Sequence, residues 1–376
     1  YCQGLCAIYL LEVLQMKILI TKFRSVGDVI LLTPLIRNLK ASYPDSEIDL
    51  MVNEGTEVLI THNPNINQII LHDRFKLRAM PIWQRIKADF KTLQSIRKKH
   101  YDIIISSDRG DRGAQIAYFS GAKFRVGRSG GKGYINNNAF THYFSFQGER
   151  HIVDLNLDPL RLLNLPVNDK GLDVYHSSKD NDKARGIAKG FGNFIHIHPV
   201  SQCMYKCIDD KVMAQIIDYC ELELNFKVVI TAAPIDQELE RVRNILKYTK
   251  STPINLSGKL TLLETAALNK LAQMLIVVDT AIMHIASAND VPVLAFFGPT
   301  AVDNWGPWDK SLTETTYQRK GGMQQHGRHR VIMDNRECVP CSQTGCNNSG
   351  VSDCLNALNL DKIKENISNI LNEKNN

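Results

Sequence analysis

The residues best suited to bind an anion lie in the last third of the chain, where an apolar run ends in a short polar segment. Residues 274–278 are rich in Val and Ile and predict a buried parallel strand. Asp279 follows where a helix N-cap belongs, Thr280 comes next, and His284 lies early on the following helix. Free backbone N–H groups and the positive end of a helix dipole favour phosphate at such a start. We therefore expect a nucleotide or a nucleotide-activated group to bind here.

Two further loops are expected at the same rim, because the carboxyl ends of neighbouring parallel strands share one edge of a sheet. One loop holds Gly298, Pro299 and Thr300 at the end of the next apolar run, and Gly298 would open its turn. The other follows the strand at 194–198, where Ser201 can donate to a phosphate oxygen and Lys206 can neutralise phosphate charge. Each residue alone is also typical of ordinary structure: a capping Asp, a turning Gly, a solvated Lys, a packed His284.

The first loop of the chain holds a carboxylate just inside a predicted helix, in the order Ser25-Val26-Gly27-Asp28. The loop lacks the three-glycine dinucleotide fingerprint and the Walker Lys-Ser/Thr ending, so neither an NAD site nor a P-loop is supported. Two interpretations of Asp28 remain open. It can complement the helix dipole, or it can act as a general base at the rim of a cleft.

Four cysteines near the end of the chain have spacing compatible with a metal: Cys338, Cys341, Cys346 and Cys354. Cys-x2-Cys followed by two more thiols suits tetrahedral zinc, although seven residues separate the second pair. Four reduced thiols in a loop-rich segment are the alternative. A zinc ion with four thiolate ligands would be structural, because it leaves no open position for catalysis.

The composition is that of an ordinary globular protein, with 376 residues, 44% hydrophobic residues and a net charge of +6. The length predicts two domains, and the charge is too small to indicate nucleic acid without a basic stripe that carries stacking aromatics. Basic residues nevertheless gather in the first half, which suits an acidic substrate or an anionic lipid surface. For residues 85–99, solvated helix faces are the simpler interpretation.

Strand-like runs alternate with helical patterns in two series, which is the rhythm of doubly wound parallel sheets in an α/β protein. The first series has strands at 17–22, 47–52 and 103–106 and a helix at 26–43; the second begins at 194–198. We expect an N-terminal extension at 1–15, domains at 16–170 and 193–355, a linker at 171–192 and a last helix within 356–376. The first fifteen residues lack the features of a signal peptide, so we expect a cytoplasmic protein with thiols instead of disulfides.

In combination these motifs resemble glycosyltransferase family 9, the ADP-heptose:lipopolysaccharide heptosyltransferases. The resemblance covers nearly everything from Met16 onward. Further segments contribute to it: residues 120–127 (Ser-Gly-Ala-Lys-Phe-Arg-Val-Gly), 151–158, and the turn at 305–308 (Trp-Gly-Pro-Trp). The cysteine cluster looks most like the heptosyltransferase III branch. One departure is Ile208, which stands where relatives usually carry a Trp after the loop lysine, so loop packing and donor preference need not match theirs.

The resemblance implies a GT-B architecture of two Rossmann-like domains that face each other across a cleft. The acceptor domain would come first, the nucleotide-sugar domain second, and the last helix would pack back on the first domain. Asp28 matches the general base, and Lys206 matches the residue that binds the donor diphosphate. The donor site would also include Ser201, Asp236 near the ribose, Asp279, Thr280, His284, Gly298, Pro299 and Thr300.

The implied reaction moves a heptose from ADP-heptose to the inner core of lipopolysaccharide. The acceptor hydroxyl must lose a proton while the departing diphosphate gains charge. No Asp-x-Asp motif ends a strand of the second series, so we expect an inverting, metal-independent displacement with no required cofactor. The acceptor would be lipid-linked, and the enzyme would touch the inner face of the inner membrane. Basic residues of the first half would bind this acceptor: Lys22, Arg24, Arg109, Arg112, Arg125, Arg128 and Lys132.

Two other functions fit the same pattern of sheets. A nucleotide-sugar 2-epimerase of this architecture would share the donor site and need no acceptor, so donor alone would yield an isomerised sugar. A non-catalytic two-domain sugar-binding protein would also show paired sheets. Turnover of a nucleotide sugar distinguishes it from either enzyme.

Overall fold

The structure, a computed structural model, describes residues 15–108, 110–128, 134–144 and 150–375. The predicted extension at 1–15 therefore lies almost entirely outside the described residues. The chain divides into two compact units, and its path between them is not a single passage. The first unit holds the described residues up to 144 and Leu155–Asp169, whereas residues 150–154 and everything from Lys170 onward belong to the second.

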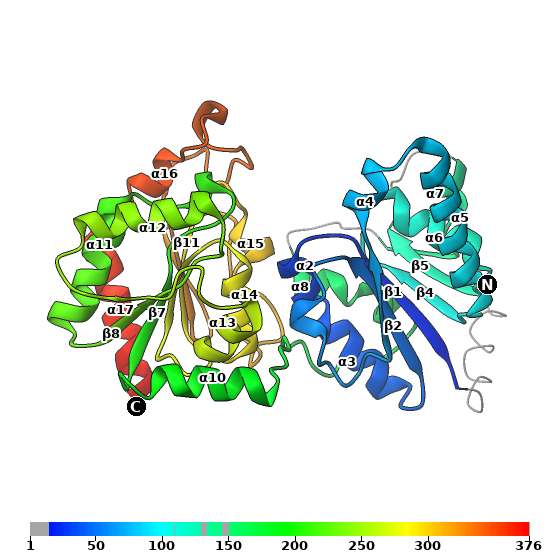
Figure 1. Ribbon diagram of the computed structural model, residues 1–376, viewed down its shortest axis with the longest axis horizontal. Helices are drawn as coiled ribbons and strands as arrows, with labels where there is room; N and C mark the ends of the chain where they lie inside the picture. The colour runs from blue at the N-terminus through cyan, green and yellow to red at the C-terminus, as the bar shows by residue number, and fades with distance from the viewer. Residues whose placement is uncertain (1–14, 109, 129–133, 145–149, 376) are drawn as a thin grey trace. The chain divides into compact units, whose positions relative to one another are not determined.

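The first unit is built on a parallel six-stranded sheet in the order β3-β2-β1-β4-β5-β6 (Figure 1). Its strands are β1 (Lys17–Lys22), β2 (Glu47–Asn53), β3 (Gln68–His72), β4 (Ile103–Ser106), β5 (Phe124–Arg128) and β6 (His142–Phe144). Its helices are α2 (Val26–Ile30), α3 (Thr33–Ser42), η1 (Val58–Ile60), α4 (Arg74–Ala79), α5 (Ile82–Lys98), α6 (Asp111–Ser120), α7 (Tyr134–Asn138) and α9 (Asp158–Leu162).

Alternation along β1 places a hydrophobic core on each face of this sheet. Ile18 and Ile20 belong to a cluster that includes Leu35 of α3, and Leu19 belongs to a second cluster that includes Ile96 of α5. Successive side chains of a strand point to opposite faces, so one strand serves both clusters. Helices therefore cover both faces, as the sequence pattern predicts for a doubly wound sheet.

The helix predicted at 26–43 is two helices, α2 and α3. Pro34 stands in the first turn of α3, where its missing N–H costs least. Inside a longer helix the same proline would remove a hydrogen bond and its ring would clash with the preceding turn. The Leu31 carbonyl at the break accepts a hydrogen bond from Asn156 Nδ2 at 2.9 Å, so the interruption leaves this group satisfied.

The second unit has a seven-stranded sheet in the order β12-β13-β11-β10-β7-β8-β9. Its strands are β7 (Phe194–His198), β8 (Lys227–Ile230), β9 (Ile254–Asn255), β10 (Leu275–Val278), β11 (Val293–Phe297), β12 (Met323–His326) and β13 (His329–Met333). The pairs β7·β8, β8·β9, β7·β10, β10·β11 and β11·β13 are parallel, and β12 pairs with β13 in an antiparallel hairpin. β7, β10 and β11 are buried along their whole length, which explains why β10 and β11 are continuous apolar runs, whereas β7 also buries His196 and His198.

The helical segments of the second unit include one that the sequence pattern assigns to a linker. They are α10 (Ser178–Ala188), η2 (Met204–Lys206), α11 (Asp210–Asp218), η3 (Tyr219–Glu223), α12 (Asp236–Tyr248), α13 (Leu262–Asn269), α14 (Ala281–Ala288), α15 (Val302–Trp305), η4 (Cys346–Asn348), α16 (Asp353–Asn356) and α17 (Leu360–Asn375). α8 (Ile152–Asn156) spans a boundary between the units. α10 begins with a Ser177 capping box and packs against α13, so the polar stretch is a surface helix. Within the described residues, no helix is long and apolar enough to cross a membrane.

The last helix, α17, packs on the second unit, whereas the family resemblance implies that it returns to the first. Ser368 Oγ lies 2.7 Å from Tyr219 Oη, Lys364 pairs with Glu223 at 2.8 Å, and Arg330 of β13 pairs with Glu373 at 2.5 Å. These partners all belong to the second unit, in which α17 also packs against α11 (Figure 1).

Buried histidines are unusually frequent in the second unit. Six have an exposed fraction of 5% or less: His151, His196, His198, His284, His326 and His329. Burial lowers the pKa to about 3 for His151, His196 and His329 and to about 4 for His198 and His326. These five rings are therefore neutral in the folded protein near pH 7.

Hydrogen bonds fix the tautomers of two of these rings. Asn269 Nδ2 lies 3.1 Å from His196 Nδ1, which makes that nitrogen the acceptor. His196 Nε2–H then donates to Thr231 Oγ1 at 2.7 Å, and the hydroxyl donates to His198 Nδ1 at 2.9 Å. The chain of donors leaves His198 with its proton on Nε2, at the carboxyl end of β7.

We expect acidification from pH 7.5 to 5.5 to destabilise the second unit. The folded-state pKa of each histidine lies below its unfolded value of 6.5, so this stability is complete above pH 6.5 and is lost as the pH falls towards 4. Each histidine contributes a slope of up to about 1.4 kcal/mol per pH unit. Urea unfolding of Trp83→Phe measures it by fluorescence, because Trp305 and Trp308 both lie in the second unit.

His198→Asn provides the matched comparison. Its side-chain amide has a polar atom close to the position of Nδ1, so it can keep the hydrogen bond to Thr231 while removing one titrating ring. The variant should show a flatter pH dependence than the parent. An unfolding free energy equal at pH 7.5 and 5.5 in the parent protein would contradict the assignment of buried neutral histidines.

Candidate functional site

Charged side chains gather in the first unit where β1 and β4 end side by side. This is the switch point of the sheet. The strand that follows β1 in the chain, β2, lies on one side of it, and the strand that follows β4, β5, lies on the other. Lys22 is the last residue of β1 and has an exposed fraction of only 2%. Its Nζ donates to the Ser107 carbonyl at 3.1 Å and lies 3.9 Å from Asp28 Oδ1. A cation is thus held at the rim where such sheets bind ligands.

Asp28 both caps a helix and faces the buried lysine. It is the third residue of α2, and its Oδ2 accepts hydrogen bonds from Ser25 N at 3.3 Å and Ser25 Oγ at 2.7 Å. Its other oxygen is the one near Lys22, and the side chain is 16% exposed. The two sequence interpretations of Asp28 are therefore compatible, because each uses a different carboxylate oxygen.

Asp108 belongs to this cluster and is missed by the sequence analysis. It follows β4, is 7% exposed, and accepts a hydrogen bond from the Phe23 backbone N–H. Burial raises the pKa of Asp108, although the charges of Lys22 and Arg24 oppose the shift. Burial also lowers the pKa of Lys22, against the charges of Asp108 and Asp28. The signal available in the sequence was a polar Ser-Asp pair directly after the apolar strand β4.

The other predicted acceptor residues have different surroundings. Arg24 Nε lies 3.9 Å from Asp108 Oδ1, and its side chain is 55% exposed. Arg112 pairs with Asp89 at 2.9 Å. Arg125 donates to the carbonyls of Ala139 and Ala122, each at 2.7 Å, so its guanidinium group connects loops of the fold. Arg128 ends β5 and is partly exposed. Two predicted residues lie outside the described part of the chain: Arg109 and Lys132.

An ion pair between Lys206 and Asp279 marks the corresponding edge of the second sheet. Lys206 follows β7 and Asp279 follows β10, and these adjacent parallel strands form the switch point of that sheet. Lys206 Nζ lies 2.7 Å from Asp279 Oδ2, with the side chains 22% and 10% exposed. Burial acts to lower the pKa of Lys206, but the charge and hydrogen bond of Asp279 outweigh it and leave the pKa raised. Lys206 is therefore a permanent cation near neutral pH.

Asp279 is not the N-cap of the helix that follows. Thr280 occupies that position with extended backbone, at φ −154° and ψ 168°, and its side chain makes no capping hydrogen bond. The prediction that Asp279 caps α14 is wrong, because its carboxylate turns to Lys206 instead. The first turn of α14 is thus left without a side-chain cap.

The remaining predicted donor residues differ in exposure. Ser201 is buried, and its Oγ accepts a hydrogen bond from Cys203 N at 3.3 Å. His284 is only 4% exposed on α14. Asp236 is exposed at the first position of α12, whereas the nearby Glu238 is buried and accepts a hydrogen bond from Ala233 N at 2.9 Å. Glu238 therefore secures the loop after β8.

The loop of Gly298, Pro299 and Thr300 is packed against the cysteine-containing tail. A Cβ at Gly298 would lie 2.8 Å from Leu355 Cγ and 3.1 Å from Cys354 Sγ, so the position excludes a side chain. The Pro299 carbonyl accepts a hydrogen bond from Ser342 N at 2.8 Å. Ser352 Oγ donates to the Tyr205 carbonyl at 2.6 Å. The tail thus supports both the Gly298 loop and the Lys206 loop.

The four cysteines of the tail do not form a zinc site in this structure. Among the described residues, no group of three or more His, Cys, Asp or Glu side chains is arranged to hold a metal ion. Cys338 is exposed, Cys341 and Cys346 are half-buried, and Cys354 is buried. Burial raises the pKa of the Cys354 thiol to about 11. The tail is held instead by the contacts described above.

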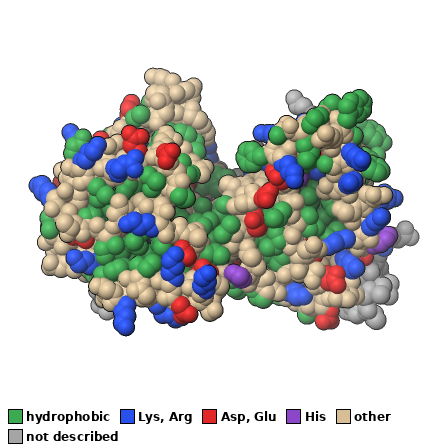
Figure 2. Space-filling view, viewed as in Figure 1, with side chains coloured by type: hydrophobic (Ala, Val, Ile, Leu, Met, Phe, Trp, Pro, Cys, Tyr) green, Lys and Arg blue, Asp and Glu red, His purple; other side chains and the backbone are tan. Residues whose placement is uncertain are grey.

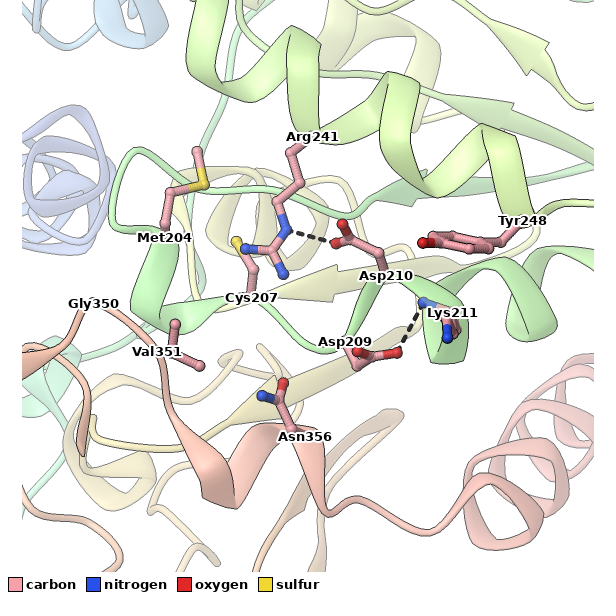
Figure 3. A pocket seen from close by; sticks show the side chains of 10 residues that line it. All are labelled: Met204, Cys207, Asp209, Asp210, Lys211, Arg241, Tyr248, Gly350, Val351 and Asn356. Carbon is pink, nitrogen blue, oxygen red and sulfur yellow. Dashed lines mark hydrogen bonds and ion pairs between the residues drawn. The ribbon is translucent and has the colours of Figure 1, made fainter.

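A cavity of about 200 Å³ lies beside the Lys206 loop, and its lining includes none of the predicted donor residues (Figure 3). Its charged groups already have partners within the protein. Arg241 Nε pairs with Asp210 Oδ1 at 2.9 Å and Arg241 Nη2 donates to the Ile208 carbonyl at 2.7 Å. Asp209 caps α11 by accepting from Lys211 N at 2.9 Å. The other lining residues are Met204, Cys207, Tyr248, Gly350, Val351 and Asn356.

Two segments that carry the family resemblance, the beginning of 151–158 and the turn at 305–308, meet in the second unit. His151 Nε2 lies 2.9 Å from the Gly306 carbonyl, and its ring is 4.8 Å from the ring of Trp308. Asn304 Nδ2 donates to the Arg150 carbonyl at 2.9 Å. Residues 150–154 are therefore tied to the turn at 305–308, although the chain on both sides of them belongs to the first unit.

Comparison with known proteins agrees with this arrangement of sheets. The model of glycosyltransferase family 9 (heptosyltransferase) matches residues 90–332. Lipopolysaccharide heptosyltransferase 3 of Escherichia coli is 28% identical over 294 residues, which cover 77% of this chain and 85% of the relative.

Two solved structures are similar over almost the whole chain. A family 9 glycosyl transferase from Veillonella parvula has a TM-score of 0.76 at 20% identity, covering 95% of this chain and 97% of its own. ADP-heptose LPS heptosyltransferase II of E. coli has a TM-score of 0.70 at 19% identity, with 96% and 100% covered. The predicted fold class, GT-B with two Rossmann-like domains, is confirmed.

We expect Lys206 and Asp279 to be coupled energetically. Lys206→Met leaves a mostly buried carboxylate without its cation, and Asp279→Asn leaves the cation without its carboxylate. Each change should destabilise the second unit, while the double variant should be more stable than the sum predicts, with a coupling of about 1–2 kcal/mol. Urea unfolding of all four proteins completes the cycle.

The exposed pair Arg185 and Asp182 is the control, since it has a similar distance of 3.0 Å but side chains 67% and 73% exposed. Its coupling should be close to zero because water screens both charges. Strictly additive effects at Lys206 and Asp279 would mean that their pairing contributes nothing to stability.

Proposed function

Because this chain belongs to glycosyltransferase family 9, the heptosyltransferases, we propose that it transfers a heptose from ADP-heptose to the inner core of lipopolysaccharide. The observation that supports this most is the Lys206–Asp279 pair at the switch point of the second sheet. Relatives agree with the choice of substrates. One is a lipopolysaccharide heptosyltransferase 3, and a solved E. coli heptosyltransferase holds ADP-2-deoxy-2-fluoro heptose.

In this proposal the second unit binds the donor. Lys206 is a permanent cation at the rim of the sheet, and it can share its charge between Asp279 and a diphosphate. The diphosphate gains negative charge as the bond to the sugar breaks, so a cation fixed beforehand lowers the barrier. Thr280 and the uncapped first turn of α14 would supply backbone N–H groups to the same phosphates. Ser201, His284, Asp236 and the Gly298–Thr300 loop would complete the donor site.

The first unit would provide the general base. Asp28 accepts the proton of the acceptor hydroxyl, whose oxygen forms a bond to the anomeric carbon as the bond to the diphosphate breaks. The products are the lengthened core and ADP, and the anomeric configuration inverts because the displacement is single. Lys22 Nζ lies 3.9 Å from Asp28 Oδ1, so a cation stands beside the proposed base. Lys22, Arg24 and Arg128 would contact anionic groups of the acceptor.

The acceptor is proposed to be lipid-linked, as for a heptosyltransferase of type III. The enzyme would then work in the cytoplasm at the inner face of the inner membrane and touch its surface without crossing it. Its basic first half suits an anionic surface of this kind. Nucleic acid is not among the proposed partners.

Incubation with ADP-heptose and a panel of truncated core acceptors tests the function, with products identified by mass. Addition of one heptose to one member of the panel is expected. Donor alone serves as the control, because an isomerised sugar without acceptor would indicate a 2-epimerase. If no nucleotide sugar is turned over, the chain is a binding protein and the transferase proposal is wrong.

Asp28→Asn is expected to lower kcat by about 10² to 10⁴, since a general base contributes this much. Asp180→Asn is a closely matched control, because Asp180 forms the same capping box with Ser177 at the start of α10. Both variants weaken a helix cap, and only the change at Asp28 should affect turnover. Equal, small losses of kcat in the two variants would show that Asp28 only caps its helix.

A chelator should leave turnover unchanged if Lys206 and the helix start carry the diphosphate charge without a metal. Rates measured with and without excess EDTA, after desalting and at constant ionic strength, make the comparison. Lost turnover that returns on addition of Mg²⁺ or Mn²⁺, with an unchanged circular dichroism spectrum, would refute metal independence.

A further inference from the structure

Two consecutive helices of the first unit, α4 and α5, carry large apolar side chains in solvent. Phe75 of α4 is 67% exposed, and on α5 Trp83 is 79%, Phe90 65%, and Ile82 and Ile86 51% each. α4 has no buried residue, and Ile96 is the buried residue recorded for α5. Packing within the unit therefore does not explain why these residues are apolar.

The apolar residues of α5 form one continuous stripe. At about 100° per residue, Ile82, Ile86, Phe90 and Trp83 fall within one arc of about 100°. The same geometry places Arg85 beside one edge of this arc, and Lys87 and Lys91 beside the other. An apolar stripe bordered by cations on both sides is typical of a helix that lies in a membrane interface.

The charge of this region is strongly one-sided. From Arg74 to Lys99 the sequence contains nine basic residues and one acid. That acid, Asp89, is paired with Arg112 of α6 at 2.9 Å, so it does not neutralise the stripe. The partner of this surface must therefore offer a continuous negative charge together with an apolar layer.

Neighbouring elements extend the apolar surface. α5 packs on α6 and α6 on α7, and Phe119 and Tyr134 of these helices are 40% and 73% exposed. Figure 2 shows hydrophobic side chains with scattered Lys and Arg over the part of the first unit where Figure 1 labels α4, α5 and α7. A fluid planar partner can cover such exposed helix faces without a complementary groove.

We propose that α4 and α5 bind the surface of a bilayer that contains anionic lipids, with Trp83, Ile86 and Phe90 inserted among the lipids and the flanking cations at the headgroups. The proposal deepens the proposed function, because a lipid-linked acceptor is held in such a surface. It replaces the interpretation of residues 85–99 as solvated helix faces: a solvated face needs the cations but not the exposed Trp and Phe.

The binding test uses the full chain without any sugar substrate, so its outcome does not depend on the transferase reaction. Vesicles of phosphatidylcholine alone and vesicles with about a third phosphatidylglycerol are compared by co-sedimentation. Binding to the anionic vesicles is expected, weakening several-fold as salt rises from about 0.05 to 0.5 M. The emission of Trp83 should shift to the blue on binding and be quenched by brominated lipid. It is isolated either in the Trp305→Phe/Trp308→Phe variant or by subtracting the spectrum of Trp83→Phe from that of the parent.

Matched variants separate the apolar and charged contributions. Trp83→Ser/Phe90→Ser and Arg85→Glu/Lys87→Glu should each lower the partition coefficient at least about tenfold. Leu222→Ser, at a 58% exposed residue of the second unit, and Lys179→Glu/Lys189→Glu, on α10 and at its C-cap, are the controls and should bind as the parent does. All these residues are exposed, so circular dichroism and thermal unfolding should be unchanged.

Several results would overturn the proposal. Equal binding to both vesicle types would show that anionic lipid is not required. No binding to either type would contradict the proposed membrane contact. Concentration-dependent dimers that the Trp83→Ser/Phe90→Ser variant abolishes, without vesicle binding, would assign the stripe to self-association. If binding is confirmed but no heptose is transferred, the membrane surface stands and the proposed function fails.

Discussion

A charge at the end of a buried strand is stable only beside an opposite charge, and this constraint organises both rims of the protein. At each switch point a lysine stands at or after the end of one strand, Lys22 at the end of β1 and Lys206 after β7, and a carboxylate follows the neighbouring strand, Asp108 after β4 and Asp279 after β10. Lys206 meets Asp279 at 2.7 Å, whereas the Lys22 ion pair recorded with Asp28 is longer, at 3.9 Å. The pKa of Lys206 is accordingly raised and that of Lys22 lowered. A further anion near Lys22 would stabilise its charged form.

Periodicity predicts the strands well because buried parallel strands are short apolar runs, and β10, β11 and the centre of β1 have this character. The same reasoning locates Asp28, Lys206 and Asp279 at strand ends. It fails where long-range contacts decide. Asp108 is distinguished by its contact with Phe23, 85 positions away, and α10 is a helix although its composition is that of a linker.

The tail shows most clearly why spacing alone does not define a site. Four cysteines suggest a zinc ion, yet the structure packs Cys354 against Gly298 as a buried thiol, and among the described residues the set is not arranged to hold a metal ion. Hydrogen bonds from Ser342 and Ser352 attach the tail to the Gly298 loop and the Lys206 loop instead. Likewise, the position of Asp279 after a strand predicts an N-cap, but its carboxylate pairs with Lys206 instead. Local propensity decides such positions only when no stronger partner is near.

The short stretch at 150–154 has a consequence for how the protein can be dissected. The polypeptide enters the second unit there, places His151 between Gly306 and Trp308, and goes back to the first unit before its final departure at Lys170. A fragment that starts at Lys170 would thus lack residues 150–154, which belong to the second unit. The Trp308 indole would then lose its contact with the His151 imidazole. The two units are accordingly interleaved along the polypeptide chain, and no single truncation yields either unit complete.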